Sequence, residues 1–310
     1  MIKFYYKTIR DQRAEVISEF KIGSWIYVEN PDEKEVAFLV QNFGLETGHL
    51  NDALDPFEVP RLEIEQGIVY IFTRVPYKED GKIITSPILV ALGETFVLTV
   101  AMKPLPFMEK FTNGQINFNT TQKVKLMLQI FSEITAAYNH FLTEIGRDVR
   151  SYIVDIEKVS NKNIVQFVLF EAVLNDFLAA LVPTNTILNN LLTANFSVKA
   201  LELYEEDKDL IEDLFLGGGQ LIESCKATLK TIVNIRDAYS TIMTNNLNRV
   251  IKLFTALTVL LTIPMIVSSF YGMNIVLPFS RHPLAFFGVA LTTILIVSIV
   301  LTIFIKKRWL

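Results

Sequence analysis

Two long uncharged stretches near the C-terminal end constrain the fold of this chain more than any other feature. Leu253 to Met273 is 21 residues and Leu284 to Ile305 is 22 residues, and neither stretch contains a charged side chain. A helix of about 20 apolar residues crosses the hydrocarbon core of a membrane. Both stretches lack charge on every face and exceed the about 10–14 residues typical of a buried soluble helix. We therefore predict two transmembrane helices, 253–273 and 284–305.

Basic residues flank these two stretches unequally. Arg249 and Lys252 precede the first stretch and three basic residues follow the second, whereas the connecting segment 274–283 contains only Arg281. Because basic residues accumulate on the cytosolic side, we predict an external loop at 274–283, a basic cytosolic tail at 306–310 and both termini in the cytosol. The N-terminal segment lacks the apolar core of a signal peptide. We expect a multi-pass protein of the plasma (inner) membrane, in contact with membrane lipid.

The rest of the chain is typical of an α+β domain followed by helices. Residues 1–115 contain β-rich runs at Trp25–Val28, Ile68–Val75, Ile83–Leu92 and Thr95–Ala101, a helical pattern at Asp32–Phe43 and a hairpin-type turn at Lys78–Lys82. From 116 to 202, apolar residues recur three and four apart through Val124–Ile145, Val149–Val159 and Ile164–Leu192. Pro183 is expected to break or kink the last of these helices. The predicted fold is a cytosolic α+β domain with a helical layer.

Composition and motifs exclude several classes of function. The net charge is −4 and no basic run exceeds three residues, so no nucleic-acid partner is expected. The sequence has no phosphate-binding glycine loop, zinc-protease motif or supported catalytic triad, so we predict that the protein is not an enzyme and uses no cofactor. The single cysteine, Cys225, excludes internal disulfides and is expected to be buried. His49, His140 and His282 are too dispersed to predict a metal site within one protomer.

One long helix is predicted to join the cytosolic part to the membrane. Helical spacing continues from Tyr204 to Tyr271, which is 68 residues. Such a helix is about 100 Å long, so 203–252 would form a cytosolic stalk outside the bilayer. Glycines 217–219 interrupt the pattern, and each costs about 1 kcal/mol relative to alanine in a helix. We expect close packing or a bend there, with a gating hinge as the alternative.

A stripe of mostly polar residues follows one face of this helix into the first predicted span. It consists of two rows with heptad spacing, Asn248, Thr255, Thr262 and Ser269, and Ile251, Thr258 and Met265. Small polar residues in a membrane commonly join neighbouring helices by close packing and hydrogen bonds. The alternative is that the stripe faces water. Since one helix cannot enclose a pore, this alternative requires an oligomer with the first span at its centre.

The first span ends in Tyr271, Gly272, Met273 and Asn274. At these residues the sequence resembles the CorA family of magnesium and cobalt channels, whose signature is Gly-Met-Asn after the first of two C-terminal membrane helices. The position of the motif, before a short loop and a second span with a basic tail, strengthens the resemblance. Two further segments are similar to the family, Asn248–Thr255 in the stalk and Asn51–Glu63 in the domain.

The resemblance implies a homopentamer whose first span lines the pore and whose residues Gly272, Met273 and Asn274 form an external selectivity ring. Mg²⁺ gives up its waters reluctantly, so a ring of amide and carbonyl oxygens suits the hydrated ion. The alternative is that Gly272 only ends the helix and Asn274 lies in an ordinary turn. The resemblance also implies closure by cytosolic Mg²⁺ bound between domains.

The acidic segment Tyr204–Asp213 is the expected regulatory site. Asp209 and Asp213 share one helix face. We take Asp213 as the stalk ligand and Asp80, in the predicted turn, as its partner from a neighbouring domain. The alternative is that these acids form a solvated face without a metal.

The external loop departs from the family pattern. Residues 275–283 contain no acid but include Arg281 and His282. Two alternatives for the function therefore remain. One is a Mg²⁺ channel that also passes Co²⁺ or Ni²⁺, and the other is a proton-coupled zinc transporter of the same fold. A third alternative is a membrane-anchored sensor or scaffold that conducts no ion.

Overall fold

A computed structural model describes residues 1–11, 13–153, 160–193, 201–273 and 283–309. The chain forms two compact units, Met1–Asn234 and Ile235–Leu310, and each is described by itself. Residues 274–282 of the predicted loop, which include Asn274 and His282, lie outside the described residues, as do residues 154–159 of a predicted helix. The domain boundaries drawn from the sequence stay predictions.

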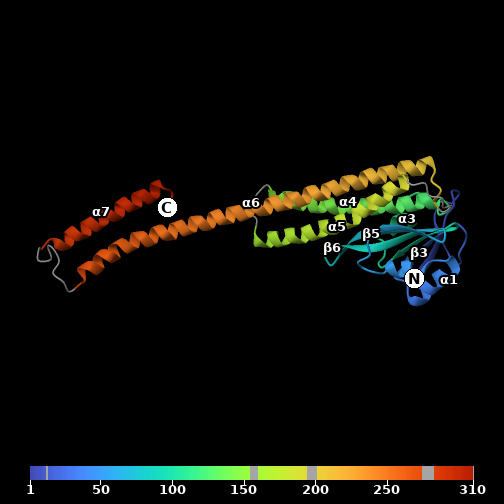
Figure 1. The fold of residues 1–310 in the computed structure, drawn as a ribbon, viewed down its shortest axis with the longest axis horizontal. Coiled ribbons are helices and arrows are strands. Elements are labelled where there is room, and N and C mark those ends of the chain that lie inside the picture. The colour runs from blue at the N-terminus through green and yellow to red at the C-terminus, as the bar shows by residue number, and fades with distance from the viewer. Residues whose placement is uncertain (12, 154–159, 194–200, 274–282, 310) are drawn as a thin grey trace. The chain divides into compact units, whose positions relative to one another are not determined.

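The first unit is built on a seven-stranded mixed sheet (Figure 1). Its order is β2-β1-β3-β7-β6-β5-β4, and only β3 and β7 pair in parallel. The strands are β1 Ile2–Tyr6, β2 Glu15–Ile17, β3 Ser24–Glu29, β4 Arg61–Glu65, β5 Ile68–Glu79, β6 Lys82–Leu92 and β7 Phe96–Ala101. The four predicted strands are confirmed as β3, β5, β6 and β7. Strands β1, β2 and β4 were not predicted from the sequence.

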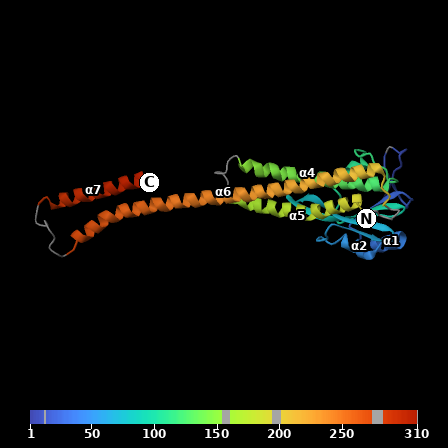
Figure 2. The same cartoon turned by 45° about the horizontal axis from the view of Figure 1, so that its top comes forward.

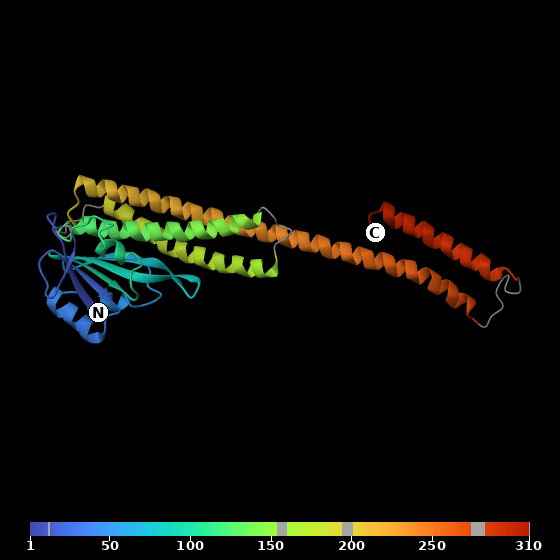
Figure 3. The ribbon, with the colours of Figure 1, turned by 180° about the vertical axis from the view of Figure 1, so that it is seen from behind.

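Helices cover both faces of the sheet. Helices α1, Glu33–Phe43, and α2, Thr47–Asp52, pack on one face, where Ile26 and Tyr70 belong to the main apolar core. On the other face, Thr73 shares a hydrogen bond of 2.8 Å with Thr184, and the hydroxyl of Tyr138 donates to the carbonyl of Arg74 at 3.0 Å. Figure 3 shows the green and yellow helices on one side of the sheet and α1, in blue, on the other. Burial of both faces explains why the central strands are almost continuously apolar.

Local sequence signals fix the predicted helix and turn. Asp32 accepts from the backbone N of Glu35 at 2.8 Å, and the Glu35 carboxylate accepts from the backbone N of Asp32 at 3.1 Å, which is a capping box. The turn between β5 and β6 consists of Asp80 at φ 49° and Gly81 at φ 76°. This two-residue turn with positive φ matches the twist of a hairpin. Both predictions are confirmed.

The helical layer consists of α3, Met108–Thr112, α4, Lys123–Ile153, and α5, Asn161–Thr193. The predicted stretches 124–145 and 149–159 belong to one helix as far as Ile153. A break or a kink is expected at Pro183; the break is wrong, because α5 continues through this residue, and the kink stays a prediction. Proline removes one backbone donor and its ring crowds the carbonyl four residues earlier, but the buried side chains of Phe177 and Leu188 hold the helix on either side. Figure 2 shows α4 and α5 in this layer, next to the yellow start of α6.

Three helices are long and apolar enough to cross a membrane, among the residues that the structure describes. One is α5, whose aromatic residues Phe167 and Phe177 are completely buried in the first unit. The others are α6, Glu205–Tyr271, and α7, Ala285–Lys306, which end in the second unit. Large apolar side chains on both are exposed there, including Leu261 at 70% and Phe286 at 76%. The predicted helix from Tyr204 to Tyr271 is confirmed to within one residue.

Candidate ion pathway and metal ligands

Helix α7 packs against one face of the membrane part of α6. Between the two helices lies a cavity of about 700 Å³, which α6 lines with Pro264, Val267, Ser268 and Tyr271. At about 100° per residue, the predicted stripe lies roughly 150° around α6 from these lining residues. The stripe therefore does not join α6 to α7 of the same chain. Asn248, Ile251, Thr255, Thr258, Met265 and Ser269 are exposed and Thr262 is half-buried.

The threonine hydroxyls of the stripe are bonded to their own helix. Each donates to the carbonyl four residues earlier, Thr255 to Ile251 at 2.8 Å, Thr258 to Phe254 at 2.8 Å and Thr262 to Thr258 at 2.7 Å. A hydroxyl has one hydrogen and two acceptor lone pairs. With the hydrogen directed to the backbone, the outer side of each hydroxyl offers an acceptor, which suits the water hydrogens of a hydrated cation.

Gly272 and Met273, the described residues of the Gly-Met-Asn motif, form a tight terminus at the end of α6. The backbone N of Gly272 donates to the carbonyl of Ser268 at 2.9 Å, and that of Met273 donates to Phe270 at 3.3 Å. Gly272 is not among the described residues with positive φ, so it does not act as a left-handed helix cap. A side chain there would lie 3.3 Å from the Ser268 carbonyl. Glycine therefore keeps the space beside this hydrogen-bonded carbonyl free of a side chain.

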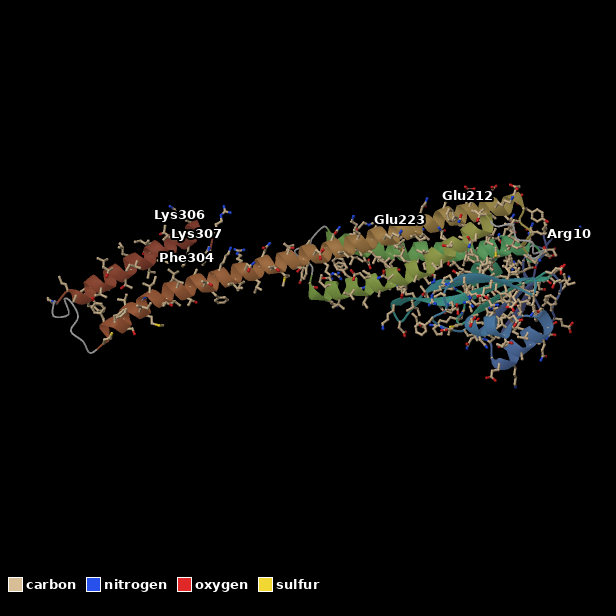
Figure 4. The ribbon with its side chains drawn as sticks, viewed as in Figure 1. Arg10, Glu212, Glu223, Phe304, Lys306 and Lys307 are labelled. Atoms are coloured by element: carbon tan, nitrogen blue, oxygen red, sulfur yellow. The ribbon has the colours of Figure 1, made fainter. Side chains whose placement is uncertain are left out.

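The acidic segment divides into partnered and unpartnered groups. Glu205 and Glu206 form ion pairs with Lys208 and Lys125, and the buried Asp207 accepts from the backbone N of Tyr204 at 3.1 Å. The structure gives no hydrogen bond or ion pair within the described chain to the exposed Asp209, Glu212 and Asp213. Figure 4 shows Glu212 on the side of α6 that faces away from the sheet.

The three predicted regulatory ligands do not form a metal site within one chain. Among the described residues, no group of three or more His, Cys, Asp or Glu side chains could hold a metal ion. Asp213 instead lines a groove of about 650 Å³ between α4 and α6, which also contains Gln129 and Gly217. The buried Oε1 atom of Gln129 has no hydrogen-bond partner. Asp80 lies apart, at its exposed hairpin turn.

The groove and its polar side chains were missed in the sequence analysis. Gln129 and Asp213 lie far apart in the sequence, and no local pattern indicates that α4 and α6 meet there. The expected close packing of the glycines is confirmed at Gly218, where a Cβ atom would lie 2.5 Å from Oδ1 of Asn185 on α5. Cys225 is buried as expected, and burial raises the pKa of its thiol to about 11.

These features define a membrane protein with two apolar C-terminal helices, a polar stripe on one of them and a large mixed α/β unit. The family model for the CorA-like Mg2+ transporter protein matches residues 21–307. The chain therefore belongs to the CorA-like Mg²⁺ transporter family, as the resemblance predicted. This is a family of transport proteins of divalent cations, and its relatives are named for transport rather than for catalysis.

Individual relatives agree with this assignment. The chain is 22% identical over 297 residues to the cobalt/magnesium transport protein CorA of Methanocaldococcus jannaschii, covering 92% of this chain and 91% of the relative. Its fold matches the complete CorA magnesium transporter structure from the same organism with a TM-score of 0.87 and 20% identity, over 100% and 99% of the two chains.

Two further solved structures share the fold. The full-length CmaX protein gives a TM-score of 0.75 at 15% identity, over 96% of this chain and 97% of CmaX. The ZntB cytoplasmic domain from Vibrio parahaemolyticus gives 0.63 at 9% identity, over 78% of this chain and 98% of that domain. The predicted fold, an α+β domain with a helical layer, a long helix and two C-terminal apolar helices, is confirmed.

Proposed function

We propose that the protein is a homopentameric channel that carries Mg²⁺, and also Co²⁺ or Ni²⁺, into the cell. The observation that carries this proposal is the polar stripe on the face of α6 opposite to α7. A polar face that α7 does not cover needs either water or a neighbouring chain beside it. Five copies of α6 with this face inward would provide both, because they enclose a water-filled path lined by hydroxyl acceptors.

The selectivity ring of this proposal consists of Gly272, Met273 and Asn274 from each chain. Mg²⁺ dehydrates reluctantly and prefers octahedral oxygen coordination. Amide oxygens of Asn274 and nearby backbone carbonyls would bind the waters of the hydrated ion without the strong attraction of a carboxylate.

The regulatory site of this proposal lies between neighbouring chains. Asp209 and Asp213 are exposed, belong to the unpartnered group and lie one helix turn apart. Asp80 of an adjacent protomer would complete the ligand set, since one chain does not supply it. Mg²⁺ bound there would offset the repulsion between acids, and its loss would let the domains separate.

Both termini are proposed to lie in the cytosol of a cell whose plasma membrane potential drives uptake. Each elementary charge gains about 2.3 kcal/mol per 100 mV, so a divalent cation gains about twice that. No coupling to a second ion is needed in this mechanism.

Replacement of Asn274 tests the proposal. Asn274→Ala is expected to abolish Mg²⁺ uptake into proteoliposomes while the mass of the purified oligomer stays that of a pentamer. The matched control is Asn190→Ala, an exposed position on α5 outside the membrane part, which is expected to conduct normally. Normal flux through Asn274→Ala would remove the selectivity ring from the account.

One observation favours a second candidate, a proton-coupled zinc transporter. The connecting segment 275–283 has no acid to concentrate cations and carries Arg281 and His282. Zn²⁺ binds imidazole readily, and histidine titrates near neutral pH. This candidate predicts that Zn²⁺ flux follows a pH gradient and falls in His282→Ala. The channel predicts that Mg²⁺ flux is the same with and without a pH gradient, and the same in His282→Ala.

A further inference from the structure

Five basic residues lie at one level of the second unit, although they come from its two opposite ends in the sequence. Tyr271 and Met273 line the cavity together with Ala285 and Phe286, so the end of α6 and the start of α7 lie at about the same level. Both helices rise by about 1.5 Å per residue. Twenty residues back along α6 from Tyr271 and twenty residues forward along α7 from Phe286 therefore bring Ile251 level with Lys306. Arg249 and Lys252 on α6 therefore share a layer with Lys306, Lys307 and Arg308 at the end of α7.

The second unit contains a single acidic residue against this layer. Asp237 is the last acidic residue of the sequence, and all residues after it carry only basic or neutral side chains. Arg249, Lys252 and residues 306–308 are exposed in the structure. Figure 4 shows Lys306 and Lys307 at the C-terminal end of α7, near Phe304. The second unit therefore does not neutralise this layer with its own side chains.

An aromatic side chain places the layer at the membrane surface. Arg308 has a left-handed backbone at φ 54°, and the backbone N of Trp309 donates to the Phe304 carbonyl at 2.9 Å. The chain thus turns back so that the Trp309 ring stacks on Phe304, with centroids 5.4 Å apart and an interplanar angle of 2°. Tryptophan is enriched at the interface between lipid chains and headgroups. We therefore expect the basic side chains beside it to lie at the height of lipid phosphates.

We propose that this basic layer, formed by Arg249, Lys252 and residues 306–308, binds the anionic headgroups of phospholipids. Guanidinium groups form bidentate hydrogen bonds with phosphate, and lysine adds compact positive charge. A lipid with a net negative headgroup is preferred over a zwitterionic one, whose own ammonium opposes the layer. The inference requires that α6 and α7 span the bilayer, and it does not require ion conduction.

Trp309 offers a direct readout in the intact protein. The chain has two tryptophans, and Trp25 is completely buried in the first unit, out of contact with lipid. The full-length protein is reconstituted in phosphatidylcholine vesicles with increasing shares of acyl-brominated phosphatidylglycerol or acyl-brominated phosphatidylcholine, and tryptophan fluorescence is recorded. Trp309→Phe gives the unquenched background. We expect stronger quenching by the brominated anionic lipid at equal share.

Two sets of variants test the assignment to the layer. Lys306→Gln, Lys307→Gln and Arg308→Gln together, and separately Arg249→Gln with Lys252→Gln, are expected to reduce the preference by up to about fivefold for each charge removed. The control removes three exposed lysines of the first unit, Lys34, Lys82 and Lys230, and is expected to keep the preference.

Three outcomes would overturn the inference. These are equal quenching by the two brominated lipids, an unchanged preference in both variant sets, and loss of the preference when inorganic phosphate is added at constant ionic strength. The last would mean that the layer binds free phosphate instead of lipid. Asn274→Ala is expected to keep the lipid preference, so failure of this inference and failure of the channel proposal are distinguishable.

Discussion

Replacing Gly218 by alanine is expected to destabilise the first unit, whereas the same change at Gly217 is expected to stabilise it. Both residues lie inside α6, and alanine favours a helix interior over glycine by about 1 kcal/mol. The surroundings differ. A Cβ atom on Gly217 meets nothing within 4 Å, but one on Gly218 would lie 2.5 Å from Oδ1 and 3.3 Å from Cγ of Asn185. The pair of variants therefore separates packing from helix propensity.

The size of the difference follows from this contact. Forcing an extra methyl group into a packed site costs about 1–3 kcal/mol, because side chains and backbone must shift. The propensity gain is common to both variants, so Gly218→Ala should be about 1–3 kcal/mol less stable than Gly217→Ala. For a unit of this size, 1 kcal/mol corresponds to about 2–4 °C in Tm.

Thermal unfolding of the full-length protein measures this difference, with Trp25 fluorescence as a probe of the first unit. We expect Gly217→Ala to raise the apparent Tm and Gly218→Ala to fall clearly below it. Asn185→Ala in the Gly218→Ala background should restore much of the loss, because it removes the colliding atoms. Equal stabilisation at both glycines would refute the close contact between α5 and α6 and would favour a hinge.

The remaining predictions concern regulation, the pore and the thiol. Asp213→Ala is expected to weaken inhibition of flux by internal Mg²⁺. The control Glu223→Ala removes an ion pair with Lys226 on the same helix and should leave this inhibition unchanged. Equal inhibition curves for Asp213→Ala and wild type would contradict the regulatory role of Asp213. Thr258→Val removes a hydroxyl whose hydrogen bond to the hydrated ion would contribute about 1 kcal/mol, so it should lower Mg²⁺ flux by about fivefold. Thr293→Val, on the α7 side of the cavity, should not lower the flux. Burial raises the pKa of Cys225 to about 11 from an ordinary value of 9.0, so the thiol stays protonated until the pH approaches 11. Because Cys225 is also completely buried, maleimide should label it slowly in the folded protein at pH 8 and rapidly after unfolding, and equally fast labelling of both states would show an accessible ordinary thiol.

Local signals in the sequence were sufficient for several elements of the fold. The capping box at Asp32, the turn at Asp80 and Gly81, and the absence of charge over two long stretches each act within one segment, so they predict their elements directly. The heptad spacing of Thr255, Thr262 and Ser269 likewise predicts a polar face. That α7 packs on the opposite face could not be predicted, because it depends on how two helices meet.

Other features depend on tertiary contacts or on weak local patterns. Strand β2 has three residues, Glu15–Ile17, too few for a clear alternation. The helix continues through Pro183 because packing on both sides outweighs the lost donor. The groove that contains Gln129 and Asp213 joins distant parts of the sequence. The ligands of the proposed regulatory site come from two chains, so neither the sequence nor one folded chain brings them together.

The most direct test of the channel is Mg²⁺ uptake into proteoliposomes under a defined potassium diffusion potential. A potential of about 60 mV, negative inside, favours accumulation of a free divalent cation by about a hundredfold. The account predicts Mg²⁺ entry that follows this potential, stops when the potential is collapsed and does not respond to an imposed pH gradient. Uptake that follows the pH gradient, or no uptake of Mg²⁺, Co²⁺ or Zn²⁺ by a correctly inserted oligomer, would contradict it.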